Sequence, residues 1–343
     1  MSASPRRILL VLLMPIGDTL FATPTIRALR KTYPAARIVA LAYPTNAGIL
    51  ESNPDIDRLL LHPTAKTWQG WRHYAGFLWR LDRMQFDLAI HFGPAQWWFA
   101  QIIRPRTRRR LQFPLWQWFV PLGPRPWRTR HAMTSYATLL MPSELENLAE
   151  APVLTSTQED RAAVSRTLGN SARGNIVAIH PGGEGFRGMK RWPAARYIGL
   201  ARALNELHGA RILVLGGPEE AELGRAIAAA VPGAHSLAGE LNLGQTVAVL
   251  ERCALFVGND SAPMHMAAAV GIPTIGIFGP TSVANFRPRG RRVEVVHAGL
   301  ACSPCFHFVG SHPVWSGSRC RVPSCLHAVS TRRVLDAAAR YLR

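Results

Sequence analysis

Residues 254–269 read ALFVGNDSAPMHMAAA, and this stretch decides the fold class. The apolar run Ala254–Val257 predicts a buried strand, the small polar residues after it a turn, and the alanine-rich segment a helix. Such a junction directs backbone N–H groups and the positive end of a helix dipole outward, where a phosphate binds well. An ordinary helix with Asp260 and Ser261 at its N-cap and Pro263 in its first turn explains the pattern equally well.

The same alternation of strand and helix recurs along the chain. Strands are predicted at 6–14, 36–42, 56–61, 87–92, 175–180, 211–215 and 254–257, and helices at 19–30, 77–84, 194–207, 219–230, 244–252 and 331–343. This order predicts parallel sheets covered by helices. Residues 150–175 carry small and polar residues and predict a linker, so we expect two doubly wound domains.

The composition indicates a globular protein with an anionic partner. The 343 residues suffice for two α/β domains, and no apolar run approaches the ~18 residues of a membrane span. A formal charge of +19 favours nucleic acid, anionic lipid or a phosphorylated glycan, without choosing among them. Lysine occurs only at Lys31, Lys66 and Lys190, because arginine supplies nearly all the positive charge.

The N-terminus has some features of a signal peptide. Arg6 and Arg7 precede the apolar segment 8–14, as a charged region precedes the apolar core of a leader. The run is short, however, and leads directly into a helix pattern. A first buried strand and a cytoplasmic location are therefore expected.

Two candidate chemical groups follow predicted strands. Asp18 comes after the first strand, and Lys190 lies in the glycine-rich loop 181–193 after the strand at 175–180. Ligands of open parallel sheets bind at the carboxyl ends of strands, so both positions favour chemistry, and the loop favours a phosphate. For Asp18, a helix cap is the alternative.

Residues 94–130 mix tryptophan with arginine. Such a mixture suits an anionic membrane interface or stacking on single-stranded nucleic acid. Tryptophans in a core beside solvated arginines are the third interpretation. The candidate contact residues are Arg104, Arg106, Arg108, Arg109, Arg110, Trp116 and Trp118.

Four cysteines near the C-terminus form the pattern C-x2-C-x14-C-x4-C. They are Cys302, Cys305, Cys320 and Cys325. In a reducing compartment this spacing is compatible with a structural metal site, a redox pair, or a reduced and partly buried loop.

Several common classes of protein are excluded by missing motifs. The first strand is not followed by G-x-G-x-x-G, and the chain contains neither a P-loop nor G-x-S-x-G. No recognisable nucleic-acid module is present. A dinucleotide dehydrogenase, a P-loop NTPase and an α/β-hydrolase are therefore disfavoured.

Taken together, the motifs resemble glycosyltransferase family 9, best known for the ADP-heptose:lipopolysaccharide heptosyltransferases. The matching segments are Gly17-Asp18-Thr19-Leu20 with Thr23-Pro24, Lys190-Arg191-Trp192-Pro193, Gly216-Gly217, Gly258 through His265, and Phe278-Gly279-Pro280-Thr281. The resemblance spans nearly the whole chain. It implies an α/β protein of GT-B fold, with two Rossmann-like domains facing a central cleft.

The resemblance also implies which ligand each domain binds. Residues 1–160 would bind the acceptor, residues 170–325 would bind the nucleotide-sugar donor, and helix 331–343 would pack back on the N-terminal domain. The implied reaction is an inverting transfer of heptose from ADP-heptose to the inner core of lipopolysaccharide. It would occur at the cytoplasmic face of the inner membrane, with the enzyme peripheral on that anionic surface, without a required cofactor and without nucleic acid.

By the same resemblance, Asp18 is the general base and Lys190 contacts the donor phosphates. One carboxylate takes the acceptor proton, and cations with N–H donors neutralise the departing diphosphate. The residues implied in donor binding are Gly17, Thr19, Gly182, Gly183, Arg187, Gly216, Gly217, Asp260, Ser261, Ala262, Pro263, Met264 and His265.

Two departures and three alternatives accompany this prediction. Ala262 stands where the family usually has glycine, so a methyl group is expected to crowd a bound phosphate or sugar. The cysteines resemble those that hold a metal in a protein-modifying branch of the family. A different nucleotide-sugar, a protein acceptor, or a nucleotide-sugar-binding protein without turnover are the alternative functions.

Overall fold

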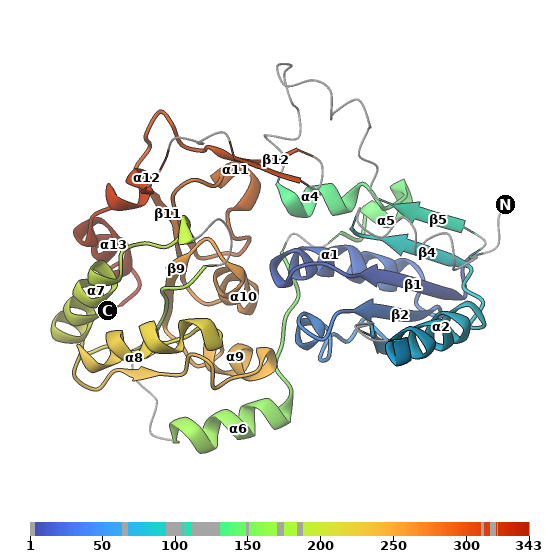
Figure 1. The fold of residues 1–343 in the computed structure, drawn as a ribbon, viewed down its shortest axis with the longest axis horizontal. Helices are drawn as coiled ribbons and strands as arrows, with labels where there is room; N and C mark the ends of the chain where they lie inside the picture. Colours follow the sequence, from blue (N-terminus) through green and yellow to red (C-terminus); the bar gives the residue numbers. More distant parts are fainter. Residues whose placement is uncertain are drawn as a thin grey trace. The chain divides into compact units, whose positions relative to one another are not determined.

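The computed structural model shows an α/β protein with two compact units (Figure 1). It describes residues 4–63, 68–93, 105, 107–110, 131–148, 151–169, 175–183, 188–309, 312–315, 320 and 322–342. The N-terminal unit comprises Met1–Arg125, Ala132–Val153 and Val309–His312, and the C-terminal unit comprises Pro126–His131, Leu154–Phe308 and Pro313–Arg343. The principal chain boundary thus falls after Val153, a few residues before the expected limit at 160.

A parallel sheet forms the centre of the N-terminal unit, with the strand order β3-β2-β1-β4-β5. Its strands are β1 Arg7–Leu12, β2 Arg37–Ala42, β3 Arg58–Leu61, β4 Leu88–His91 and β5 Thr107–Arg110. After their first residue, β1 and β2 are entirely buried, as expected for central strands covered on both faces.

The helices of the N-terminal unit include the long α1. They are α1 Ile16–Thr32, the 3-10 turn η1 Ala47–Ile49, α2 Trp68–Asp82, α4 Ala132–Ala137 and α5 Pro142–Leu145. Helix α1 tolerates Pro24 in its interior, although proline cannot donate to the carbonyl four residues earlier. The Thr23 hydroxyl donates to that carbonyl, of Leu20, at 2.8 Å.

A second sheet forms the centre of the C-terminal unit, in the order β11-β10-β9-β6-β7-β8 with every pair parallel. The strands are β6 Ile176–His180, β7 Arg211–Val214, β8 His235–Ser236, β9 Leu255–Asn259, β10 Thr274–Phe278 and β11 Val293–His297. A separate hairpin pairs β12 Phe306–Val309 with β13 His312–Trp315.

Helices cover the second sheet and complete its core. They are α6 Gln158–Leu168, α7 Ala194–His208, η6 Pro218–Glu220, α8 Ala221–Ala229, α9 Leu243–Leu250, α10 Ala262–Val270, α11 Val283–Phe286, α12 Ser324–His327 and α13 Thr331–Ala338. The core joins β6, β7, β9 and β10 to α7 through side chains such as Val177, Val257 and Leu200.

The last helix contributes to the core of the C-terminal unit. Val334, Ala337 and Ala338 of α13 are buried in the core of the C-terminal unit, and α13 packs against α7. The apolar face of α13 is thus used within the C-terminal unit, and its packing on the N-terminal domain, which the resemblance implies, stays a prediction.

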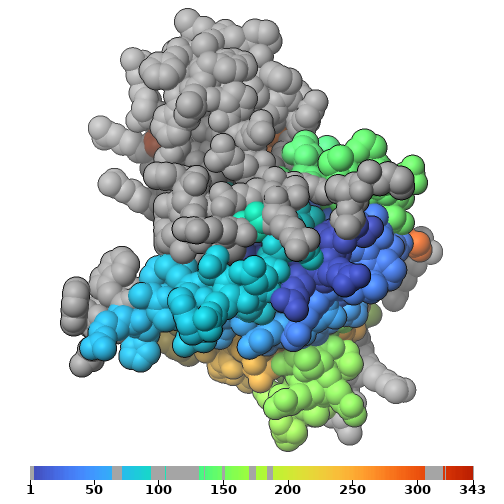
Figure 2. Space-filling view, turned by 90° about the vertical axis from the view of Figure 1, so that its right-hand side faces the viewer, coloured from blue at the N-terminus to red at the C-terminus, as the bar shows by residue number. Residues whose placement is uncertain are grey.

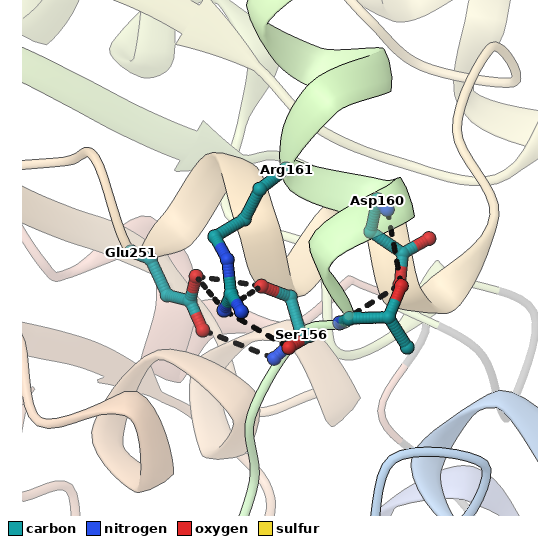
Figure 3. A network of polar contacts seen from close by, with 5 residues as sticks. Ser156, Asp160, Arg161 and Glu251 are labelled. Carbon is teal, nitrogen blue, oxygen red and sulfur yellow. Dashed lines mark hydrogen bonds and ion pairs between the residues drawn. The ribbon is translucent and has the colours of Figure 1, made fainter.

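A polar cluster fixes the beginning of the main C-terminal segment (Figure 3). Ser156 donates to Glu251 through its backbone N–H at 3.0 Å and its hydroxyl at 2.6 Å, and Arg161 lies 3.4 Å from the same carboxylate. Thr157 and Asp160 form a capping box at the start of α6. Because α6 packs on α9, the chain is held to the C-terminal unit as soon as it enters it.

Each sheet has one point where the strand order reverses. From β1 the chain proceeds to β2 and β3 on one side, and β4 lies on the other; likewise β6 leads to β7 and β8, whereas β9 lies on its other side. Ligands of doubly wound sheets bind in the crevice at such switch points. Asp18 follows β1, and the loops that carry Lys190 and Asp260 follow β6 and β9. Among the described residues, no helix has the length and apolar character needed to cross a membrane.

Candidate active site

The centre of the C-terminal candidate site is an ion pair between two loops. Nζ of Lys190 lies 3.2 Å from Oδ2 of Asp260, and Nε2 of His265 lies 3.8 Å from Oδ1 of the same carboxylate. Lys190 keeps 19% of its side chain exposed, whereas Asp260 keeps 6%. The structure therefore brings together three of the residues expected to bind the donor, with the cation on the more accessible side.

The charge of Asp260 is maintained by its neighbours. Burial alone would raise the pKa of this carboxyl group, but the Lys190 ammonium and His265 outweigh burial and lower the pKa to about 2. Asp260 is thus ionised at neutral pH and attracts the lysine. An anionic ligand that binds Lys190 competes with Asp260 for the same cation.

Asn259 connects the two loops and was missed by the sequence analysis. Its Oδ1 accepts from the backbone N–H of Trp192 at 3.1 Å, and its Nδ2 donates to the carbonyls of Pro181 and Gly182 at 3.0 and 2.7 Å. The Tyr197 hydroxyl lies 3.0 Å from the same Oδ1. Asn259 is completely buried, so one amide fixes both ends of the Lys190 loop beside β9.

Ser261 departs from its expected role as a helix cap. It occupies the N-cap position of α10, but its side chain makes no capping hydrogen bond. Its hydroxyl lies 3.0 Å from Nδ1 of His180 and donates to the Asn259 carbonyl at 3.1 Å. Burial, with the Arg191 charge, lowers the pKa of His180 to about 4, so this ring is neutral at pH 7. The serine side chain consequently accepts no hydrogen bond from the first N–H groups of α10.

The remaining residues of this stretch lie in the first turns of α10. Met264 and His265 are buried, whereas Ala262 and Pro263 are partly exposed. Ala262 is the first residue of the helix, where any L-residue fits the backbone. The alanine therefore imposes no local strain in place of a glycine.

Glu220 is a second residue that the sequence analysis missed. Its carboxylate accepts from the Gly217 N–H at 2.9 Å and pairs with Arg191 at 3.2 Å, while burial raises its pKa. A Cβ atom at Gly182 would lie 2.5 Å from this carboxylate, and one at Gly216 would lie 2.7 Å from the Glu220 Cβ. The expected glycines thus make room for Glu220. Gly183, at φ 153°, follows in the same loop.

Asp18 lies at the switch point of the N-terminal unit. Helix α1 begins at Ile16, earlier than the sequence predicted, so Gly17 and Asp18 lie in its first turn. The Tyr136 hydroxyl donates to Oδ1 of Asp18 at 2.9 Å. Thr19 is buried, and its hydroxyl accepts from Asn46 at 2.6 Å.

The structure separates the predicted residues into two groups. Gly17, Asp18 and Thr19 belong to the N-terminal unit, and Lys190, Asp260 and their neighbours belong to the C-terminal unit. Arg104, Arg106, Trp116, Trp118 and Arg187 lie outside the described residues. Arg108, Arg109 and Arg110 belong to β5, where only the backbone is described.

In the part of the chain that the structure describes, no disulfide joins the four C-terminal cysteines. Burial raises the pKa of Cys305 and of Cys325, and neighbouring thiols of the group raise both further. The described residues include all four cysteines, and they contain no group of three or more His, Cys, Asp or Glu side chains placed to hold a metal ion.

Residues 107–315, more than half of the chain, match the family model for glycosyltransferase family 9 (heptosyltransferase). The chain belongs to glycosyltransferase family 9. This family 9 enzyme is 28% identical over 299 residues to lipopolysaccharide heptosyltransferase 3 of Escherichia coli, with 82% of this chain and 86% of that protein covered.

Solved structures confirm the predicted fold of this family 9 enzyme. A family 9 glycosyltransferase from Veillonella parvula matches with a TM-score of 0.80 at 22% identity, over 98% of this chain and 97% of that chain. E. coli heptosyltransferase WaaC with ADP matches with a TM-score of 0.70 at 18% identity, over 98% and 99%. The enzyme therefore has the GT-B fold of a glycosyltransferase, as the sequence motifs predicted.

Proposed function

We propose that this enzyme transfers heptose from ADP-heptose to the inner core of lipopolysaccharide with inversion of configuration. The names of its relatives support this proposal, since they include a lipopolysaccharide heptosyltransferase and a heptosyltransferase solved with ADP. The observation that carries it is the Lys190–Asp260 pair at the switch point of the C-terminal unit. A cation in that crevice suits a nucleotide diphosphate.

The C-terminal unit is proposed to bind the donor. Lys190 would exchange its contact with Asp260 for one with the diphosphate, and the N–H groups at the start of α10 would add hydrogen-bond donors. The interactions of the ammonium and of the N–H groups with the diphosphate become stronger as negative charge develops on the leaving ADP. The protein thereby supplies the positive field itself, so no metal is required in this proposal.

The N-terminal unit is proposed to bind the acceptor, with Asp18 as the general base. Inversion needs one carboxylate that removes the acceptor proton as the sugar is transferred. Asp18 lies in the first turn of α1 at the switch point and is partly exposed. A carboxylate there is positioned where ligands of this fold bind.

Replacement of Asp18 by asparagine tests the catalytic proposal. We expect Asp18→Asn to lower turnover of ADP-heptose with a core-truncated lipopolysaccharide by ~10² or more while ADP still binds. Asp336→Asn, at an exposed i,i+4 pair of α13, is the matched control and should retain activity. Full turnover by Asp18→Asn would contradict the general base, and binding without turnover by the wild type would favour a nucleotide-sugar-binding protein.

A thermal-shift comparison tests the nature of the donor. ADP is expected to raise the melting temperature more than UDP or GDP at equal concentration, because only a bound ligand stabilises the native state. A screen of ADP- and UDP-sugars against a core-truncated glycolipid and a protein acceptor then distinguishes heptose transfer to lipopolysaccharide from the alternatives. Preference for UDP, or transfer to protein, would contradict the proposed substrates.

We also propose a cytoplasmic enzyme that is peripheral on the inner membrane. The formal charge of +19 supports attraction to anionic lipid and to a phosphorylated acceptor. Figure 2 shows the segment that contains α2 in light blue on the surface of the N-terminal unit. Arg72 and Arg80 of α2 and Arg83 directly after it are exposed, and Trp79 is 59% exposed. The Arg83 guanidinium lies 4.3 Å from the centre of the Trp79 ring.

Vesicle binding tests the membrane proposal. Binding to vesicles with phosphatidylglycerol should weaken as salt rises, because exposed charges are screened. Changing Arg108, Arg109 and Arg110 together to serine should weaken it further. Unchanged binding by that variant would exclude this arginine group as the contact, and equal binding to neutral vesicles would contradict an electrostatic attachment.

A further inference from the structure

Tyr136 is held against the carboxylate of Asp18. Its hydroxyl donates to Oδ1 of Asp18 at 2.9 Å, across the contact between α4 and α1. The tyrosine side chain is buried, and its ring lies 5.7 Å from that of Phe92 at a tilt of 56°. Phe92 directly follows β4, the strand on the other side of the switch point.

The hydroxyl of Tyr136 keeps its proton. Burial raises the pKa of this phenol well above its ordinary value of 10, and the Asp18 charge and the hydrogen bond raise it further. Asp18 is the charged group that acts on it. Tyr136 is therefore a permanent hydrogen-bond donor at neutral pH, and a carboxylate oxygen is the acceptor.

A hydrogen bond to one oxygen of a carboxylate also sets the direction of the other oxygen. An aspartate carboxylate rotates about its last torsion with little preference, so its two oxygens are otherwise interchangeable. Donation to Oδ1 fixes the plane of the carboxylate and hence the direction of Oδ2. A general base must be aligned with the proton that it removes, and donation to the charged form also favours the ionised state.

From this geometry we infer that Tyr136 is a positioning residue for the proton transfer, acting through Asp18. The inference rests on the proposed function, since it gives Asp18 the part of general base. Tyr136 orients the carboxylate and keeps it ionised, while the acceptor hydroxyl gives its proton to Asp18. No bond to Tyr136 forms or breaks.

The same helix provides a matched control. At the other end of α1, the hydroxyl of Tyr33 donates to Oε1 of Glu144 at 2.7 Å. This pair also joins α1 to a neighbouring helix, α5, and has the same donor and acceptor chemistry. Removal of the Tyr33 hydroxyl reports the structural cost of losing a tyrosine–carboxylate bond away from Asp18.

The experiment compares Tyr136→Phe with Tyr33→Phe in the full-length enzyme. We expect Tyr136→Phe to lower kcat by about 10- to 100-fold, the loss typical of a hydrogen bond to a charged group, with the KM for ADP-heptose unchanged. The acidic limb of its pH–rate profile should move to higher pH, because the ionised carboxylate has lost a donor. Tyr33→Phe should keep the wild-type kcat and pH profile.

Two further variants keep the test decisive. Substitution of 3-fluorotyrosine at position 136 preserves the shape and strengthens the donor, so the acidic limb should move in the opposite direction. In an Asp18→Asn background, Tyr136→Phe should cause no additional loss, because the two residues act as one unit.

The possible results separate the two proposals. A wild-type kcat and pH profile for Tyr136→Phe, or an acidic limb indifferent to 3-fluorotyrosine, would overturn the role of Tyr136 even if Asp18→Asn is inactive. Full activity of Asp18→Asn would overturn the general base and the inference with it. Equal losses in Tyr136→Phe and Tyr33→Phe would reduce the contact to a structural one.

Discussion

Lys190 and Asp260 form an ion pair, with Nζ 3.2 Å from Oδ2, although 70 residues separate them in the chain. The pair joins the loops that follow two neighbouring strands, β6 and β9. The lysine contacts a buried carboxylate, which defines the position of its ammonium group. A ligand then meets an oriented cation, which lowers the ordering cost of binding.

Removal of Lys190 should weaken donor binding. We expect Lys190→Ala to lower the ADP affinity by about tenfold or more, since a charge-assisted hydrogen bond is worth ~1.5–3 kcal/mol, and Lys190→Arg to restore it only in part. Isothermal titration with ADP measures the change. Lys31→Ala, at the exposed end of α1, is the control and should bind ADP normally. An unchanged ADP affinity for Lys190→Ala would exclude this lysine as a donor contact.

Asn259 should be more important for stability than its size suggests. Asn259→Ala removes the partner of the Trp192 N–H and of two carbonyls in a fully buried site, at a cost of roughly 3 kcal/mol or more. Asn205→Ala, which removes a single bond to the Ala210 carbonyl, should cost ~1 kcal/mol. Urea unfolding compares the two. Equal costs would contradict the role of Asn259 as the junction of the loops.

The stability of the enzyme should decline in mild acid because of buried histidines. Burial lowers the pKa of His131 to about 4, against 6.5 in the unfolded chain. Between pH 6.5 and about pH 4, His131 binds a proton in the unfolded state but not in the folded state. The free energy of unfolding therefore falls over this range and levels off below about pH 4.

The variant His131→Gln isolates this effect. It removes the titration, so its loss of unfolding free energy between pH 6.5 and 4 should be smaller than that of the wild type by about 2 kcal/mol. Urea unfolding at a series of pH values measures it. His235→Gln, at an exposed histidine, should follow the wild type, and parallel curves for His131→Gln and the wild type would refute the assignment.

Gly182 should not accept a side chain. A Cβ atom there would lie 2.5 Å from the buried carboxylate of Glu220, so Gly182→Ala must displace this carboxylate. The substitution should lower the free energy of unfolding by about 1–3 kcal/mol and weaken ADP binding. Gly199→Ala in α7 meets Thr331 only at 3.7 Å and should be neutral or stabilising. Thermal unfolding with and without ADP tests both. A Gly182→Ala protein as stable as the wild type would show that Glu220 moves aside freely.

The sequence sufficed for the fold and for the approximate location of the site. Alternating strand and helix patterns predict parallel sheets, and in such sheets the residues after the strands gather at one edge. That rule predicts that Lys190 and Asp260, which both follow strands, lie at the same edge of the sheet. The helix predicted at 19–30 begins three residues earlier, at Ile16, because Pro15 serves as its N-cap.

The partners of the functional side chains could not be predicted. Asn259, Glu220 and Tyr136 are ordinary residues in the sequence, and each acquires its role from a contact that only the folded chain creates. The surface on which α13 packs could not be predicted either. An amphipathic pattern shows that a helix has an apolar face but not which surface covers that face.

The interlaced course of the chain limits how family members can be recombined. Pro126–His131 belongs to the C-terminal unit, although the main boundary lies after Val153. The His131 ring contacts the Arg287 carbonyl at 2.7 Å, and both residues belong to that unit. In a chimera whose residues before 154 came from a relative, the residue facing the Arg287 carbonyl would be the relative's and not His131. Designs that combine the acceptor half of one relative with the donor half of another should therefore transplant His131 together with the donor half.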